Sequence, residues 1–362
     1  MTTLFGSTQS TATSSSSLGD LKNDVEVANP PEDSISDLAF NPDPEQANDL
    51  LAVASWDKKV RIYEITPTGQ NQGVAQIEHD APVLSVDFFR DGKKVISAGA
   101  DNNIKVLDLV SGQTTQVKAH DQPVKCVRTF TANGTPMAVT GSWDKTIKYW
   151  DFRSDQPAMT VNCQERVYAL DVRDDLLVVG TADRYLNVVK MNDPSRFYKT
   201  IQSPLKWQTR VVSCFLKGKG DDGYAIGSIE GRCAIQYVEE KDSASNFSFK
   251  CHRDAPQGNV TNVHALNAIS FHPQHGTFST AGSDGTFHFW DKDAKHRLKG
   301  YPTVGGSINA TAFNKSGAIF AYSVSYDWSK GYQGNVASYP RKIMLHPVQG
   351  DECKPRPSVK KR

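Results

Sequence analysis

The fold is decided by the stretch Gly141-Ser142-Trp143-Asp144-Lys145-Thr146-Ile147-Lys148-Tyr149-Trp150-Asp151, because this stretch recurs along the chain. Two further copies are Ala54-Ser55-Trp56-Asp57-Lys58-Lys59-Val60-Arg61-Ile62-Tyr63-Glu64 and Ala281-Gly282-Ser283-Asp284-Gly285-Thr286-Phe287-His288-Phe289-Trp290-Asp291. In each copy a small residue and a Ser or Gly precede a turn that contains Asp. An alternating strand that ends in Trp-Asp or a related pair follows. Such an internal repeat sets the architecture before any local pattern does.

Weaker copies of the repeat start at Ala98, Gly180 and Gly227, and Ser325-Tyr326-Asp327 marks a last, divergent one. The seven turn acids are Asp57, Asp101, Asp144, Asp183, Glu230, Asp284 and Asp327. Their spacing is close to the ~40–45 residues of a four-stranded propeller blade. Residues 34–348 therefore accommodate seven blades of about 45 residues each.

An alternating apolar run that suits the inner strand of a blade lies upstream of each turn. These runs are Ile35 to Phe40, Val83 to Phe88, Val124 to Phe130, Val167 to Val172, Val211 to Leu216, Leu266 to Phe271 and Ile308 to Phe313. No amphipathic helix of convincing length appears. The sequence thus predicts an all-β protein, and the blades resemble WD40 repeats, which implies a seven-bladed WD40 β-propeller.

The WD40 resemblance implies a structural tetrad in each regular blade, made of a loop His, a strand Ser or Thr, the turn Asp and a strand Trp. Two blades match in full, with His120, Thr140, Asp144 and Trp150 in one and His252, Thr280, Asp284 and Trp290 in the other. A third blade has His79, Ser97 and Asp101, but Leu107 replaces the Trp. The resemblance makes these His and Asp residues structural rather than catalytic.

The ring of blades also has to close. The last blade has only three clear strands, which end with Ile343-Met344-Leu345-His346, whereas the short alternating run Asp24 to Ala28 has no partner near it in sequence. We expect this run to pair as the outer strand of the last blade, since that removes an open sheet edge. The expected domains are a disordered Ser/Thr-rich arm (1–20), the propeller (21–350) and a basic tail (351–362).

Composition narrows the class of protein. The chain has 362 residues, 41 Lys and Arg against 40 Asp and Glu, and 38% hydrophobic residues, as an ordinary globular protein has. No apolar run approaches the ~18 residues that span a bilayer, and residues 1–19 lack the features of a secretory signal. The six cysteines show no C-x-x-C pair, so we expect buried thiols in a reducing compartment.

Charge is unevenly distributed along the chain. Residues 1–50 carry nine acids and one lysine, so the remainder is basic, and the C-terminus ends in a basic run from Lys354 to Arg362. Such runs are usually solvated and disordered, and a nucleic-acid or import-signal role is the alternative.

Sequence motifs for catalysis are absent. The chain has no P-loop, G-x-G-x-x-G after a strand, H-E-x-x-H or G-x-S-x-G. The nearest candidate metal pair, His272 and His275, fits a solvated turn better. We expect a non-enzymatic protein that needs no cofactor and no metal, and whose function lies in its surfaces.

Three surface features are candidates for that function. Trp56 and Trp143 sit on tight turns of one face, where exposed aromatics favour partner binding, unless each packs on a neighbouring blade. Arg210 and Arg232 lie in loops of the same face and suit a carboxylate-bearing peptide, although Arg232 has Glu230 as an alternative partner.

The third feature runs from Trp290 to Lys299, with Phe247 to Arg253 of the preceding blade expected beside it. Aromatic rings interleaved with cations suit single-stranded nucleic acid. The alternative is that Trp290 is half buried as a tetrad residue.

Several stretches resemble one family of WD40 propellers more specifically, the nuclear-pore-associated mRNA export factors in their fungal form. They are Ser203 to Arg210, Gly223 to Arg232, Phe247 to Arg253, Gly282 to Leu298, Ala294 to Thr303 and Phe320 to Gly331. The resemblance implies a non-enzymatic adaptor of the nucleus, nuclear envelope and nuclear pore complex that shuttles to the cytoplasm. Such adaptors bind the GLEBS segment of an FG nucleoporin, an acidic hairpin, as a monomeric propeller within a heterodimer, and they contact single-stranded RNA of the mRNP.

Carried over residue by residue, the resemblance assigns nucleoporin (GLEBS) binding to Trp56, Trp143, Lys206, Arg210 and Arg232. It assigns nucleic-acid binding to Phe249, Lys292, Lys295 and Arg297.

The alternative is the related spindle-checkpoint propeller, whose kinase partners also carry GLEBS segments. It shares Gln164 to Leu170 and the run Ser228-Ile229-Glu230-Gly231-Arg232. The Ser325 to Trp328 blade and the Trp290 to Asp293 cluster favour the export factors. A substrate receptor of a ubiquitin ligase would carry a further N-terminal motif, and none is visible.

Overall fold

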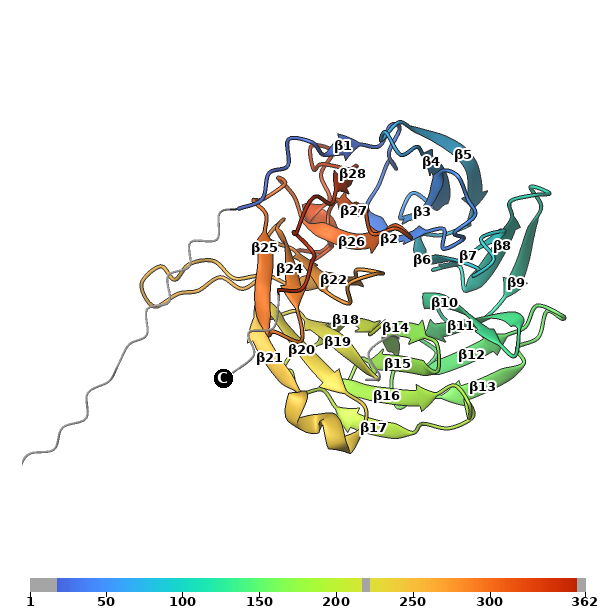
Figure 1. Ribbon diagram of the computed structural model, residues 1–362. Coiled ribbons are helices and arrows are strands. Elements are labelled where there is room, and N and C mark those ends of the chain that lie inside the picture. The colour runs from blue at the N-terminus through green and yellow to red at the C-terminus, as the bar shows by residue number, and fades with distance from the viewer. Residues whose placement is uncertain (1–17, 217–221, 357–362) are drawn as a thin grey trace, which may run out of the picture.

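Seven four-stranded antiparallel sheets stand around a central axis and form a closed ring (Figure 1). The computed structural model describes residues 18–216 and 222–356. The predicted seven-bladed β-propeller is therefore confirmed.

The blades are numbered here in chain order, each with its strands from the inner to the outer edge. Blades 1 to 3 are β2 (Ile35–Phe40), β3 (Asp49–Ser55), β4 (Lys59–Ile65), β5 (Asn71–Glu78); β6 (Val83–Phe88), β7 (Lys94–Gly99), β8 (Asn103–Asp108), β9 (Thr114–Lys118); and β10 (Val124–Ala132), β11 (Thr135–Ser142), β12 (Thr146–Trp150), β13 (Met159–Asn162). Blades 4 and 5 are β14 (Val167–Arg173), β15 (Leu176–Thr181), β16 (Tyr185–Lys190), β17 (Lys199–Gln202); and β18 (Thr209–Cys214), β19 (Gly223–Ser228), β20 (Arg232–Tyr237), β21 (Phe247–Lys250). Blades 6 and 7 are β22 (Leu266–Phe271), β23 (Phe278–Gly282), β24 (Phe287–Asp291), β25 (His296–Gly300); and β26 (Ile308–Phe313), β27 (Ile319–Val324), β28 (Lys342–Pro347), β1 (Val25–Glu26). Two short 3₁₀ helices, Glu240–Ser245 and Tyr332–Gly334, lie in loops.

Burial follows the position of a strand within its blade. The second strands are buried almost throughout, as in β15 and β19, because neighbouring blades cover both faces of the sheet. The outermost strands β13, β17 and β21 bury only alternate residues, because solvent covers one face. The core is accordingly divided into clusters, most of which span adjacent blades.

A β-bulge recurs near the start of the innermost strand of every blade. A bulge adds a residue to one strand and redirects its side chain. The residues at these seven positions all line the central channel: Ser36, Leu84, Lys125, Tyr168, Arg210, Asn267 and Asn309. The bulges thus decide which side chains surround one end of the channel.

The ring closes as the sequence predicts. β1 pairs antiparallel with β28, with Val25 opposite Leu345, and the Val27 amide donates to the Ile343 carbonyl at 2.8 Å. Next to this pairing, the buried imidazole of His346 bonds Asp24 at 2.7 Å and Glu352 at 3.3 Å. Residues from both ends of the chain therefore meet on one histidine.

The tetrad residues are brought together in blades 3 and 6. In blade 3 the His120 imidazole contacts Asp144 at 2.8 Å and Thr140 at 2.7 Å, and the Trp150 indole N–H donates to Thr140 at 2.9 Å. In blade 6 the His252, Thr280, Asp284 and Trp290 side chains repeat these contacts at 2.9–3.1 Å. Burial tends to raise the pKa of Asp144, but hydrogen bonds from His120 and Thr146 prevail and lower it. Blade 2 keeps His79, Ser97 and Asp101, with buried Leu107 in place of the indole.

The propeller includes more of the C-terminal segment than residues 21–350. Cys353 is 2% exposed in the blade 6–7 core, and the Thr277 hydroxyl donates to its carbonyl. The packed chain thus extends to residue 353 rather than ending at 350. Residues 1–17 of the predicted arm (1–20) and residues 357–362 of the predicted tail (351–362) lie outside the described residues. All six cysteines are free thiols, four of them buried.

Candidate protein and nucleic-acid interfaces

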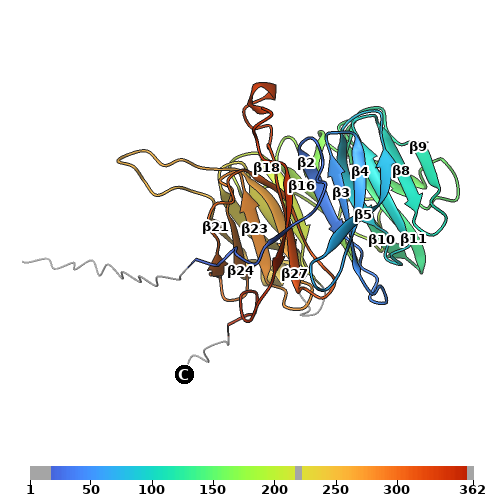
Figure 2. The same cartoon turned by 90° about the horizontal axis from the view of Figure 1, so that it is seen from above.

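One face of the propeller, here called the turn face, carries the turns between second and third strands and the loops between blades. Two of its loops are long. The loop 251–265 folds into a hairpin with bridges Arg253 to Val263 and Gln257 to Val260, and the loop 325–341 connects β27 to β28. Both project from the body of the ring (Figure 2). The turns after the first and third strands of each blade form the opposite face.

Exposed apolar side chains gather on the turn face. Five of them are Trp143 (38% exposed), Trp207 (58%), Ile229 (40%), Val260 (65%) and Tyr332 (78%). They come from loops of blades 3, 5, 6 and 7 and the segments that join them. Exposed aromatic and aliphatic side chains on one face make this face a candidate for partner binding.

Trp56 differs from Trp143 in its surroundings. Its indole is partly buried and stacks on Trp328 with ring centroids 4.1 Å apart, and Trp328 in turn contacts Tyr326. Packing against the neighbouring blade, the alternative for Trp56, is therefore present. Trp143 remains on the surface.

Arg210 lies at the turn-face end of the channel, where the bulge of β18 directs it. Its guanidinium donates to the Asp327 carbonyl at 3.1 Å. The Asp327 carboxylate accepts from Ser283 at 2.5 Å, so the three residues connect blades 5, 6 and 7. Lys206, in the loop before β18, is exposed.

Arg232 occupies the start of β20 and lies 3.6 Å from the Glu230 carboxylate. Arg253 approaches the same carboxylate at 3.9 Å and donates to the Glu230 carbonyl at 2.9 Å. The intramolecular pair with Glu230 is thus formed. The Arg232 side chain keeps 31% of its surface exposed, so two guanidinium groups share one acid on this face.

A second cluster lies on the rim between blades 5 and 6, here called the rim cluster: Phe247, Phe249, Trp290, Lys295 and Arg297. Phe249 on β21 packs against Trp290 of the next blade, with centroids 4.4 Å apart. The Lys295 amine lies 5.0 Å from the centre of the Phe247 ring. Lys295 and Arg297 are exposed, in the turn before β25 and on that strand.

Lys292 is placed differently from the other predicted nucleic-acid residues. It is 7% exposed, its amine contacts Asp293 at 2.6 Å and lies 4.9 Å from the centre of the Phe215 ring. The charged amine of Lys292 therefore interacts within the interface between blades 5 and 6 and is not displayed on the surface.

Comparison with known proteins identifies the family. The WD40 family model (WD domain, G-beta repeat) matches residues 26–64, 72–108, 112–151 and 247–291. The chain is 74% identical to "mRNA export factor GLE2" of Chaetomium thermophilum over 362 residues, which is all of both chains. It is 58% identical over 355 residues to "Poly(A)+ RNA export protein" of Schizosaccharomyces pombe, 98% of each chain. It is 44% identical over 338 residues to "mRNA export factor" of Danio rerio, 92% of this chain and 91% of the relative. The chain belongs to the mRNA export factor family of WD40 proteins.

This family membership confirms the resemblance that was drawn from the sequence. The turn face also contains candidates that the sequence did not single out, notably Trp207, Val260 and Tyr332. Trp207 lies in one of the stretches that resemble the family. Its aromatic side chain in a polar loop was the feature from which an exposed binding residue could have been predicted. Tyr332 and Val260 lie in insertions outside the repeat, where the pattern predicts nothing.

Clustered metal ligands do not occur in the part of the chain that the structure describes. His272 and His275 stack with centroids 4.4 Å apart, but no group of three His, Cys, Asp or Glu side chains suited to a metal occurs within residues 18–216 and 222–356. None of the helices in those segments is long and apolar enough to cross a membrane.

Proposed function

We propose that this protein is a non-enzymatic adaptor in the nuclear export of poly(A) mRNA. Its turn face binds the acidic GLEBS hairpin of an FG nucleoporin, and its rim cluster contacts single-stranded RNA at the nuclear pore. The names of its relatives, mRNA export factor and poly(A)+ RNA export protein, support the export role.

The observation that carries the proposal is the apolar turn face. Trp143, Trp207, Ile229 and Tyr332 are each at least 38% exposed and lie on loops of the same face. Aromatic side chains of this kind supply most of the binding energy of an interface when a partner buries them.

Charge on the turn face fits an acidic partner. Arg232 and Arg253 share the single carboxylate of Glu230. Lys206, which precedes Arg210 in the same loop, is exposed. Guanidinium groups bind carboxylates in a bidentate manner, which orients a peptide as well as attracting it. Arg210 adds a cation at the mouth of the channel, although its guanidinium also holds the Asp327 carbonyl.

The rim cluster fits single-stranded nucleic acid. Phe249 and Trp290 provide aromatic surface, and Lys295 and Arg297 provide charge beside it. Base stacking on such rings contributes ~1–3 kcal/mol per base, and the cations bind phosphates. We assign RNA contact to Phe249, Lys295 and Arg297, with Lys292 positioning the turn that carries Lys295 through its pair with Asp293.

The RNA assignment is tested by fluorescence anisotropy with a labelled single-stranded RNA, with and without a GLEBS peptide, at two salt concentrations. We expect salt-sensitive binding that weakens about tenfold in the double variant Lys295→Ala and Arg297→Ala. The matched control is Lys199→Ala with Arg196→Ala, which removes two cations from blade 4. Equal loss in both double variants would contradict the assignment.

The same titration distinguishes the export adaptor from the alternative function, a checkpoint adaptor that binds a GLEBS-bearing kinase. Binding of the peptide together with RNA supports the export adaptor. Binding of the peptide with no affinity for RNA in either state would favour the checkpoint role instead.

A further inference from the structure

The central channel is a third candidate ligand site, separate from the turn face and the rim cluster. It forms a cavity of about 420 Å³ lined by residues from all seven blades. Each blade contributes residues of its innermost strand, and blades 1, 2, 5, 6 and 7 also contribute residues that follow this strand, so the cavity extends from the bulges at the turn-face end to the opposite face.

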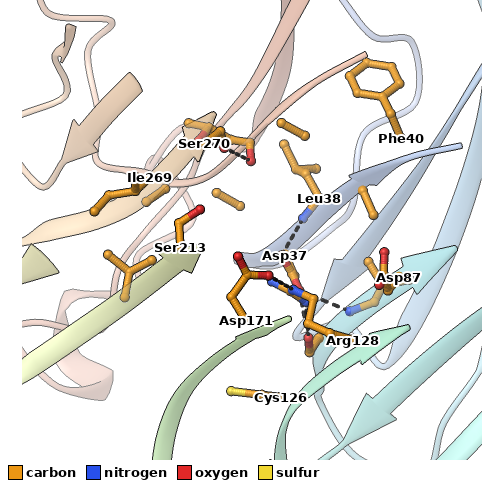
Figure 3. A pocket seen from close by; sticks show the side chains of 18 of the residues that line it. Asp37, Leu38, Phe40, Asp87, Cys126, Arg128, Asp171, Ser213, Ile269 and Ser270 are labelled. Carbon is orange, nitrogen blue, oxygen red and sulfur yellow. Dashed lines mark hydrogen bonds and ion pairs between the residues drawn. The ribbon is translucent and has the colours of Figure 1, made fainter. Parts of the chain in front are cut away.

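The middle of the channel is occupied by a charged network centred on Arg128 of β10 (Figure 3). Its guanidinium lies 2.9 Å from the Asp37 carboxylate and 3.8 Å from that of Asp171, and it donates to the Ser85 hydroxyl at 3.0 Å. These groups belong to blades 1 to 4. One partly buried guanidinium therefore balances the charge of two inward-facing carboxylates.

The third inward-facing carboxylate, Asp87, has internal donors. It accepts the Thr129 amide at 2.8 Å and the Thr129 hydroxyl at 3.1 Å. Burial raises the pKa of Asp87, against the opposing effects of Arg128, Arg90 and these hydrogen bonds. Each of the three aspartates therefore has a cation or a hydrogen-bond donor of the channel wall as a partner.

The cations that line the channel outnumber its carboxylates. Besides Arg128 they are Arg90, Lys125, Arg173, Arg210 and Lys315, against Asp37, Asp87 and Asp171. Lys125 and Arg210 lie at the turn-face end. Arg173 ends β14, and Arg90 and Lys315 follow the ends of β6 and β26, so all three lie at the opposite end.

None of the three cations at the opposite end forms an ion pair with a carboxylate of the described residues, although Arg90 acts electrostatically on Asp87, against the rise in the pKa of that group. The Lys315 amine donates to the backbone carbonyls of Asp43, at 2.9 Å, and Gln46. Neither Arg90 nor Arg173 forms an ion pair with an acid in the described segments, and Arg90 is exposed. Cations from blades 2, 4 and 7 consequently line one end of the channel.

We propose that this end of the channel binds a small multivalent oxyanion, bearing phosphate or carboxylate groups, through Arg90, Arg173 and Lys315. Guanidinium forks from two blades can each hold one oxyanion group, while the Lys315 amine supplies a point charge from a third. The ligand is small because the cavity is about 420 Å³ and the Arg128 network fills its middle. The site stands on residues that the proposed adaptor function does not use.

Isothermal titration calorimetry of the full chain with tripolyphosphate and, separately, with citrate tests this site. Saturable 1:1 binding of either anion is expected, and the tighter of the two identifies the preferred oxyanion. Arg90→Gln and Arg173→Gln should each weaken binding about tenfold, and the double variant should show no saturable binding. The control is Arg196→Gln, an exposed arginine of the same face that pairs with Asp193 away from the channel.

Folding is checked by the melting temperature of each variant, and Arg90 is exposed, so its removal leaves the core intact. Saturable binding by neither anion would overturn the proposal. Binding that persists in the double variant, or that falls equally in Arg196→Gln, would overturn it too, since it would reflect general surface charge.

Discussion

Thr140 shows how a single side chain holds a blade together. Its hydroxyl lies between the His120 imidazole and the Trp150 indole, and it is fully buried. Replacement by Val keeps the shape but leaves two buried polar groups without a partner. We expect Thr140→Val to lower the free energy of unfolding by about 2 kcal/mol, measured by urea denaturation.

Blade 2 provides the matched comparison for this prediction. Ser97 bonds His79 at 2.8 Å, but Leu107 takes the place of the indole, so Ser97→Ala leaves only one of the two groups unpaired. The loss there should be about 1 kcal/mol. Equal losses in the two blades would show that the indole bond contributes nothing.

Lys292 and Arg297 should respond oppositely to substitution, since one is buried and the other exposed. We expect Lys292→Ala to lower the melting temperature, because it removes the contact between Lys292 and Asp293 and opens space beside Phe215. Arg297→Ala should leave the melting temperature unchanged and weaken RNA binding. A thermally silent Lys292→Ala that loses RNA affinity would return Lys292 to the surface role predicted from sequence.

The strands were predictable because alternation and turn chemistry act locally. The inner strands Ile35–Phe40 and Leu266–Phe271 coincide with the predicted runs. The bulges and the hairpin of residues 251–265 were not predictable, since they interrupt the repeat rather than follow it. The stack of Trp56 on Trp328 was beyond reach for another reason: it joins two residues that meet only when the ring closes.

The closing strand carries a prediction about pH. His346 lies between Asp24 and Glu352; burial tends to lower its pKa, but the two acids prevail and raise it to about 9. A histidine with a raised pKa stabilises the fold fully below its unfolded pKa, about 6.5, and this stabilisation is lost as pH rises through about 9. We expect His346→Gln to remove about 3 kcal/mol at pH 6. The difference from wild type should shrink by about this amount by pH 10, because only the packing and hydrogen bonding of the neutral imidazole then remain.

Denaturation curves at pH 6, 8 and 10 measure this difference. His264→Gln is the control, because His264 also contacts an acid, Asp254, but on the exposed hairpin, and should change stability little at any pH. A difference between wild type and His346→Gln that stays constant from pH 6 to 10 would contradict the protonated clasp.

Across the whole molecule, the ring separates three surfaces. The apolar turn face, the rim cluster of blades 5 and 6 and the cationic end of the channel occupy different places on one rigid frame. The sequence located parts of the first two, because family-like stretches and exposed aromatics mark them. The sequence did not reveal the cationic end of the channel, because Arg90, Arg173 and Lys315 are far apart in the chain. They line the same end of the channel only because the ring is closed.

The central claim is that the turn face binds an acidic hairpin, and the most direct measurement is anisotropy of a labelled GLEBS peptide titrated with wild type and Arg232→Glu. Reversing this charge places a second carboxylate beside Glu230 and should weaken binding at least ~30-fold, with an unchanged melting temperature. Arg196→Glu, on the opposite face, should bind as wild type does. Full affinity of a folded Arg232→Glu variant would contradict the account.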